Sequence, residues 1–515
     1  MKNSIRTVGN IFFIIFFSKL LGQAREMMVA SSFGTGGVAD SFIAATQIPL
    51  NFFDLILGAA IVSTFVPVFN EYLEKDGVKR ANDFSNNFVG VITVLSVVIS
   101  VLGVLFSGTV VGIMTSFENA ETSILASKLL KIMFPSMILT AIAYSYAGVL
   151  QSFGQFNAPA AMSVVSNAVS IGYLLVFKNR FGITGLAVSM LVGWIMQLVL
   201  LIPFLVKHKY KFGFKVNFAE AGMIKVYKLA LPILLSSWVQ PINVMFNTKL
   251  ASLMDRGVSV INYSNKLYLI IASVFTVAVT NMILPELSRL YASEGKEEAG
   301  KVIGNSLKAT SLFILPVMAL FIVFSVPIVR IIYENGKFDE TSVQLTSSAL
   351  MCYSIGMVGY AWQEVLNKSF YSMQESKIPL QTAIIAIIIN VIVSLSLFKF
   401  AGVSGLAIAA AVSATCSGII LFVRMGKTNT FLPHKEVVGV LVKGVVAATI
   451  SAIVAKLLYC AIVPTDASKF ILLLCVGGVC ILAIIMYVLL LLLLRCKEVT
   501  ELKSLIAKKK GANNE

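Results

Sequence analysis

The feature that most constrains this chain is a succession of long apolar runs. About fourteen stretches of roughly 20 mostly apolar residues fill most of its length, and each is long enough to cross a bilayer as a helix. Only 13% of the 515 residues are charged and 57% are hydrophobic. A soluble globular protein would have about a quarter of its residues charged. The sequence therefore predicts an all-α polytopic membrane protein and argues against a soluble enzyme.

The apolar runs fall into two sets of six and a final pair. The first set covers residues 9–33, 40–70, 84–112, 123–150, 158–177 and 182–206. The second set covers residues 223–251, 257–286, 305–331, 341–366, 378–398 and 402–424, and the pair covers 437–460 and 469–494. We expect about 14 transmembrane helices from this pattern.

The two sets of six resemble each other. The segment 181–187 (FGITGLA) recurs as 401–407 (AGVSGLA), and Pro67 with Gly77 answers Pro285 with Gly295, at an offset near 220. Parallel six-helix repeats are a recurring transporter architecture, with the substrate site at the lobe interface. We expect an N-lobe at 1–222, a C-lobe at 223–430, two further helices within 431–495 and a basic tail at 496–515.

The distribution of Lys and Arg indicates the orientation. If the amino terminus is inside, most of the 41 basic residues flank the cytoplasmic ends of the expected helices, notably in the loop 207–228 and the tail. Both termini are therefore expected in the cytoplasm of a multi-pass plasma-membrane protein. The net charge of +16 then needs no nucleic-acid partner. Membrane lipids are the expected partners of the basic tail.

Residues 18–26 (SKLLGQARE) place ionisable side chains within the first apolar run. At 100° per residue Lys19, Gln23, Arg25 and Glu26 share an arc of roughly 160°, opposite an apolar face. A charge at mid-bilayer costs on the order of 3 kcal/mol, so such a face normally looks into a bundle or a wet cavity. The alternative is structural: Arg25 extends to the membrane surface, and Lys19 pairs with Glu26.

Other expected helices also carry inward-facing polar groups. Lys266 lies too deep in the eighth run to reach the surface easily. The residues expected to line a cavity are Glu26, Gln23, Asp40, Asp54, Ser236, Gln240, Asn243 and Asn247. For a single Ser or Asn, an interhelical hydrogen bond is the commoner role.

The sequence shows no catalytic constellation. Its two His residues, His208 and His434, lie in expected cytoplasmic loops, and the six Cys residues have no metal-ligand spacing. We therefore expect no enzyme activity, no metal site and no cofactor.

Four motifs in register resemble one family. SKLLGQARE, FGTGGVADSF at 33–42, ATQIP at 45–49 and FVPVF at 65–69 resemble the MurJ (MviN) family of lipid II flippases, within the multidrug/oligosaccharidyl-lipid/polysaccharide exporter superfamily. The resemblance implies alternating access between two lobes, with a diphosphate held by Arg25, Lys19 and Lys266. It also implies that the last two helices form a groove for a lipid tail.

The resemblance leaves alternatives open. Phe53 stands where the family usually has an arginine, so another undecaprenyl-diphosphate-linked oligosaccharide is an alternative cargo to lipid II. A cation-coupled multidrug antiporter is a more distant alternative. Some relatives bind sodium, and Asn243, Asn390 and Ser394 are candidate ligands here, although a hard cation would favour a carboxylate. Coupling to sodium, protons or the membrane potential, and a monomeric state, are further expectations.

Overall fold

The computed structural model describes residues 2–47, 49–50, 61–237, 239–293, 295–463 and 468–500. Within these ranges, the side chains of residues 2–12, 62, 232–237, 239–240, 274–275, 277–278, 281–282 and 292 are not described. The described chain is helical and contains no strand, which confirms the predicted all-α class. It divides into two compact units, which are taken separately below.

Unit 1 comprises Met1–Ser259 and Asn335–Asp339. Its helices are α1 (Lys2–Phe33), α2 (Gly37–Gln47), the short π-helix η2 (Ile61–Phe65), α4 (Val66–Lys75), α5 (Gly77–Leu105), α6 (Ser107–Met114), α7 (Ala120–Met133), α8 (Ser136–Ser152), α9 (Asn157–Val176), α10 (Lys178–Lys207), α11 (Ala221–Ser237) and α12 (Val239–Ala251). The division of the units at Ser259 places α11 and α12 with the first six predicted crossings. The lobe boundaries expected from the repeat stay a prediction.

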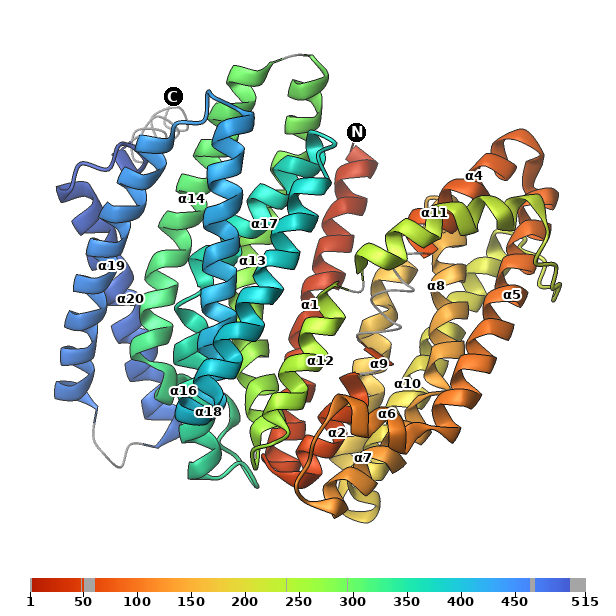
Figure 1. Cartoon of the computed structure of the whole chain (residues 1–515), viewed down its shortest axis with the longest axis horizontal. Helices are drawn as coiled ribbons and strands as arrows, with labels where there is room; N and C mark the ends of the chain where they lie inside the picture. The colour runs from red at the N-terminus through yellow and green to blue at the C-terminus, as the bar shows by residue number, and fades with distance from the viewer. Residues whose placement is uncertain are drawn as a thin grey trace. The chain divides into compact units, whose positions relative to one another are not determined.

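Unit 2 comprises Val260–Glu334 and Glu340–Glu515. It contains most of α13 (Gly257–Ala292), then α14 (Lys296–Val323), α15 (Ser325–Tyr333), α16 (Glu340–Ser354), α17 (Met357–Ser372), α18 (Lys377–Thr428), α19 (His434–Ile462) and α20 (Lys469–Leu493). Helices α19 and α20 lie beside α14 (Figure 1).

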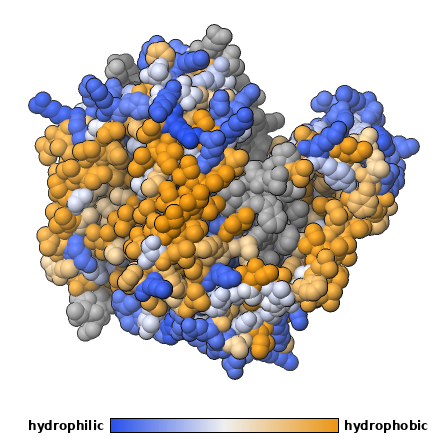
Figure 2. All heavy atoms as spheres, in the orientation of Figure 1, coloured by the Kyte–Doolittle hydropathy of each residue, from blue (hydrophilic) through white to orange (hydrophobic). Residues whose placement is uncertain are grey.

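Most of the predicted apolar runs overlap one of these helices or a pair of them, the runs 378–398 and 402–424 share α18, and the run 40–70 lies partly outside the described residues. The run 123–150, for example, is α7 followed by α8, with a break at Phe134–Pro135, because proline has no N–H to continue the helix. Eight helices of the described chain are long and apolar enough to cross a membrane. The total of fourteen crossings stays a prediction. Hydrophobic residues cover the flanks of the helices and hydrophilic residues gather at their ends (Figure 2).

The internal repeat is visible in the backbone of two glycines. Gly182 in α10 has φ 55° and ψ −145°, and Gly402 in α18 has φ 54° and ψ −133°. Only glycine adopts this region readily, so each residue kinks its helix. The two positions are related by the offset near 220 that relates the repeated motifs. The α18 kink falls at the first residue of the predicted helix 402–424, just after the predicted helix 378–398.

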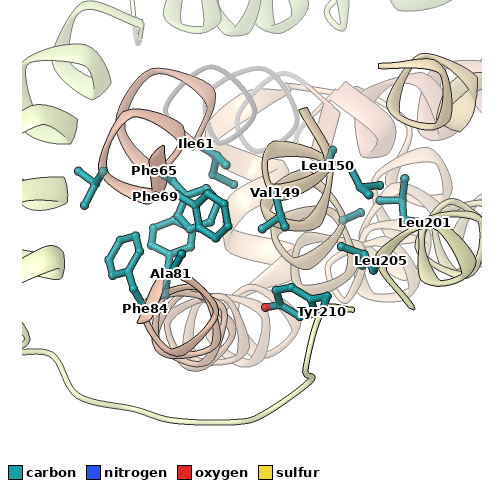
Figure 3. Packing of buried hydrophobic residues seen from close by; sticks show 14 of the residues in the cluster. Ile61, Phe65, Phe69, Ala81, Phe84, Val149, Leu150, Leu201, Leu205 and Tyr210 are labelled. Carbon is teal, nitrogen blue, oxygen red and sulfur yellow. The ribbon is translucent and has the colours of Figure 1, made fainter. Parts of the chain in front are cut away.

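Each unit has its own core. In unit 1 an aromatic group from η2 to α5 is central, with the Phe65 and Phe88 rings 4.4 Å apart (Figure 3). In unit 2, Leu315 on α14, Ala447 on α19 and Leu491 on α20 pack together. The Tyr487 hydroxyl donates to the Leu312 carbonyl at 3.0 Å. The final helix pair is therefore an integral part of unit 2.

Candidate functional site: the first helix and its carboxyl end

The charged stretch of α1 is divided between the interior and the surface. Phe16, Phe17 and Leu20 are exposed, whereas Ser18 and Glu26 are buried. The Ser18 carbonyl accepts a hydrogen bond from Asn167 Nδ2 on α9, which packs along α1. The helix thus turns its apolar face outward and part of its polar face toward α9, as an apolar surrounding would require.

The ionisable residues of α1 differ in environment. Arg25 Nη2 lies 2.7 Å from Glu26 Oε1, and both side chains are largely buried. Lys19 is exposed, and no carboxylate of the described residues lies within ion-pair distance of it. The structure therefore pairs Glu26 with Arg25. Lys19 is the cation of this stretch that remains accessible to an anionic ligand.

Beyond α1, a buried carboxylate caps another helix. Asp40 on α2 is 2% exposed, and its Oδ1 accepts a hydrogen bond from the Ser259 N–H at 2.7 Å. Ser259 lies in the first turn of α13, where backbone N–H groups have no partner within the helix. A carboxylate at this position satisfies one such donor and interacts favourably with the helix dipole.

The segment 335–339 closes over the end of α1. The Lys337 N–H donates to the Ser31 carbonyl at 2.8 Å. Gly34, with φ +68°, ends α1 so tightly against this segment that a Cβ there would lie 2.4 Å from the Lys337 carbonyl oxygen. Glycine is therefore required for the close approach of the two backbones.

An ion pair completes this group. Arg256 Nη1 donates to both carboxylate oxygens of Asp339, at 2.7 and 2.9 Å. The hydrogen bond to Asp339 raises the pKa of the Arg256 guanidinium, which stays charged. We define Asp40, Arg256, Ser259, Lys337 and Asp339 as the mouth cluster, and all five belong to unit 1.

The predicted diphosphate ligands fall in both units. Lys19 and Arg25 belong to unit 1, and Lys266 lies on α13 in unit 2. Lys266 is half-buried next to Asn265, whose side chain hydrogen-bonds Tyr353. The convergence of the three cations on one diphosphate stays a prediction.

The predicted polar lining is only partly described. Asp54 lies outside the described residues, as do the side chains of Ser236 and Gln240. Gln23, Asn243 and Asn247 are half-buried. The side-chain oxygens of Asn243 and Asn247 are buried and have no hydrogen-bond partner.

The candidate cation ligands also divide between the units. Asn243 is in unit 1, and Asn390 and Ser394 are one turn apart on α18 in unit 2. Asn390 is 1% exposed and neither its Oδ1 nor its Nδ2 has a hydrogen-bond partner, and Ser394 Oγ is likewise unpartnered. An amide and a hydroxyl oxygen are suitable ligands for a hard cation. In the described residues, no three His, Cys, Asp or Glu side chains cluster as metal ligands would.

Sequence reasoning found Asp40 and missed the rest of the mouth cluster. Its other members come from turns near residues 256 and 338, far from α1 in sequence. Charged turn residues are common, so no local pattern distinguishes Arg256 and Asp339 as partners. The glycines at 34, 36 and 37 were the one feature of the sequence that indicated a close approach of another backbone segment to the end of α1.

Comparison with known proteins identifies the family. The family model described as lipid II flippase MurJ matches residues 29–477. A probable lipid II flippase MurJ of Buchnera aphidicola subsp. Baizongia pistaciae is 24% identical over 456 residues, covering 88% of this chain and 89% of that protein. The probable lipid II flippase MurJ of Vibrio cholerae is 28% identical over 418 residues, covering 79% of each.

Solved structures agree on the fold. A lipid II flippase MurJ in an inward closed conformation matches with a TM-score of 0.79 and 22% identity, covering 93% of this chain and 97% of that one. An inward-facing multidrug resistance transporter of the MATE family, in the MOP superfamily, matches with a TM-score of 0.69 and 15% identity, covering 81% and 95%. The family match extends over most of the described helices, and the chain belongs to the lipid II flippase MurJ family.

Proposed function

We propose that this protein is a transporter that moves lipid II from the inner to the outer leaflet of the bacterial cytoplasmic membrane, for peptidoglycan synthesis. The observation that carries the proposal is the family match over residues 29–477. The structure adds a largely buried arginine, paired with Glu26, and an exposed lysine within the mostly apolar segment 11–33 of the first helix. Such cations are costly in a membrane unless they serve a ligand or a pathway.

Arg25, Lys19 and Lys266 are proposed to hold the diphosphate of the cargo. Phosphate oxygens accept several charge-assisted hydrogen bonds, and a guanidinium can donate two at once in a fixed geometry. The Arg25–Glu26 pair orients the guanidinium before the cargo arrives. The last two helices, α19 and α20, are proposed to accommodate the lipid tail along their exposed apolar residues, such as Leu474 and Ile481.

The mouth cluster is proposed to close the outer end while the cargo enters from the cytoplasm. It joins α1 and α2 to segments far along the chain through hydrogen bonds and one bidentate ion pair. Outward opening would break these bonds together. This requires a closed state that is stable by only a few kcal/mol, so that cargo or a coupling ion can shift the equilibrium.

The proposal also includes topology and driving force. Both termini are assigned to the cytoplasm, and the protein is taken to act as a monomer. Moving a negative charge outward is favoured by about 2.3 kcal/mol per 100 mV of inside-negative potential. Asn390 and Ser394 are proposed to contribute to a sodium site, because their buried polar atoms lack partners.

A second cargo has one observation in its favour. Phe53 occupies the position where the family usually has an arginine, so one diphosphate ligand of the family is absent. A different undecaprenyl-diphosphate-linked oligosaccharide is therefore the second candidate. Phe53 lies outside the described residues.

The test uses cells in which an Arg25→Ala variant is the only copy of the protein. Outer-leaflet lipid II is measured with and without an uncoupler of the membrane potential. We expect loss of outer-leaflet lipid II for Arg25→Ala when it is compared with the parent at equal protein abundance, and a reduced rate for the parent after uncoupling. Normal flipping by Arg25→Ala would make Arg25 only the structural partner of Glu26.

A further inference from the structure

Residues 207–218 form a basic and aromatic strap between α10 and α11. Its sequence is KHKYKFGFKVNF, and residues 210–217 adopt neither helix nor strand. The strap, defined as residues 207–218, lies wholly within unit 1. Neither the transport proposal nor the mouth cluster gives it a role.

Two adjacent asparagines on α5 hold the strap by its backbone. Asn86 Nδ2 donates to the Lys211 carbonyl at 2.8 Å, and its Oδ1 accepts from the Gly213 N–H at 3.1 Å. Asn87 Nδ2 donates to the Asn217 carbonyl at 2.9 Å, and its Oδ1 accepts from the Asn217 N–H at 2.6 Å. Both asparagines are buried. The amides supply the partners that an extended backbone would otherwise find in a sheet or in water.

Tyr210 anchors the beginning of the strap in the core of unit 1. It is 5% exposed, and its hydroxyl lies 2.9 Å from both Asn86 Oδ1 and Ser85 Oγ. The ring lies among the core residues near Leu205, with its oxygen directed toward the helix that carries Phe84 (Figure 3). The strap is therefore fixed in place although it has no secondary structure.

The anchored strap presents apolar side chains outward. Phe212, Phe214, Val216 and Phe218 occupy alternate positions of the extended backbone and are 47%, 67%, 41% and 46% exposed. Four large apolar side chains in seven residues are unusual on a water-exposed loop. Exposed apolar patches of this kind commonly mark a contact with a protein or a membrane.

The strap also carries uncompensated positive charge. Its lysines at 207, 209 and 211 have no carboxylate within ion-pair distance among the described residues. The neighbouring carboxylates are already paired, Asp83 with Lys215 at 3.0 Å and Glu220 with Arg80 at 3.1 Å. A partner for this surface should therefore be anionic as well as apolar.

The strap lies at the edge of the apolar belt. A Cβ on Gly90 of α5 would lie 1.9 Å from the Lys215 carbonyl oxygen, so helix and strap are in direct contact there. Leu95, one and a half turns further along α5, is 40% exposed, and Val206 of α10, just before the strap, is 58% exposed. At 1.5 Å per residue, Leu95 lies about 7.5 Å along α5 from the contact. Hydrophilic residues gather at the α4 end of unit 1, above an apolar flank (Figure 2).

We propose that the strap is a membrane-surface anchor that binds anionic phospholipid headgroups. Phe214 and Phe218 would enter the boundary between headgroups and acyl chains, where aromatic rings are favoured, and the lysines would contact the phosphates. Phe212, whose ring packs against Tyr146 and Tyr210, would hold the strap against unit 1. The assignment to the inner leaflet rests on the orientation given under the proposed function. The anchor itself does not depend on the cargo.

The first experiment measures phosphatidylglycerol binding to the purified full-length protein by native mass spectrometry. Each lysine near an anionic surface contributes about 1 kcal/mol to binding. We therefore expect the variant Lys207→Gln/Lys209→Gln/Lys211→Gln to bind phosphatidylglycerol about fivefold more weakly for each lysine removed. The matched control Lys377→Gln/Lys427→Gln/Lys435→Gln removes the same charge from exposed sites elsewhere and should bind like the parent. Equal affinity of the strap variant and the parent, or equal weakening by the control, would overturn the proposal.

The second experiment locates the aromatic residues. Phe214→Trp protein is reconstituted in nanodiscs containing phosphatidylglycerol, and its fluorescence is compared with that of the parent, which has three tryptophans of its own. The fluorescence of the added tryptophan should be quenched by lipids brominated near the headgroup and should not be quenched by iodide in the water. Quenching by iodide and not by brominated lipid would place Phe214 in water and refute the anchor. Because Phe214 is exposed, the substitution leaves the core intact.

Discussion

Neutralising Asp40 should loosen the mouth cluster without unfolding the protein. Its carboxylate is 2% exposed and accepts the Ser259 N–H at 2.7 Å, at the amino end of a helix. A hydrogen bond to a charged group contributes about 1.5–3 kcal/mol, against about 1 kcal/mol for a neutral pair. Asp40→Asn keeps an acceptor of nearly the same shape and loses only the charge. We expect the closed cluster to lose about 1–1.5 kcal/mol, which corresponds to a roughly five- to tenfold larger open population.

Amide hydrogen exchange measures this opening directly. The Lys337 N–H bonds to Ser31 and does not touch Asp40, so its exchange reports on the cluster as a whole. Exchange of the peptide containing Lys337 should accelerate about five- to tenfold in Asp40→Asn, since exchange follows the open population. Asp255→Asn is the matched control, because Asp255 is 83% exposed, lies 3.6 Å from Arg256 and should contribute little. Unchanged Lys337 exchange in Asp40→Asn, with the rest of the exchange pattern preserved, would show that Asp40 does not hold the mouth closed.

Three further predictions concern other parts of the chain. Lys266→Ala should abolish flipping and Lys266→Arg should retain it, as measured by outer-leaflet lipid II; equal activity of both would remove Lys266 from the site. Lys308→Met should accelerate hydrogen exchange in residues 496–500, because the buried Lys308 ammonium lies 3.0 Å from Glu498 and 3.2 Å from Glu436; unchanged exchange would mean that these ion pairs do not hold the segment. Gly182→Ala should lower the unfolding temperature, because φ 55° and ψ −145° lie in a region that only glycine adopts readily and strain there costs about 1–3 kcal/mol. A Cβ at this position would meet no atom within 4 Å, so the effect measures backbone strain alone; Gly172→Ala, in an ordinary helical conformation, is the control and should not destabilise.

The all-α class could be predicted from the sequence because each long apolar run indicates a helix by itself, without knowledge of distant contacts. Long apolar runs in a membrane must be helical to satisfy their backbone groups, and the run expected at 469–494 is α20. The runs expected at 84–112 and 305–331 overlap α5 and α14, but those helices begin earlier in the chain and end before the predicted runs do. The motif offset near 220 recurs in the structure as a shared kink at Gly182 and Gly402, which the sequence alone did not predict. Helix breaks such as the one between α16 and α17 were not predicted, because the residues on both sides remain apolar.

The site was less predictable because its contacts are distant in sequence. The periodicity of α1 correctly separated buried Glu26 from exposed Leu20. The periodicity could not indicate which basic residue would pair with Glu26. In the structure that residue is Arg25. The partners of Asp40 and Ser31 lie at 259 and 337. Only the folded chain brings such residues together, and single charged residues in turns carry no signal of it.

The cargo is tested most directly by depleting the protein in its native cells and identifying the lipid-linked precursor that accumulates in the inner leaflet. The account predicts that lipid II accumulates there, that outer-leaflet lipid II falls, and that re-expression of the parent, but not of Arg25→Ala, reverses both changes. Accumulation of a different undecaprenyl-diphosphate oligosaccharide, with lipid II normal in both leaflets, would contradict it.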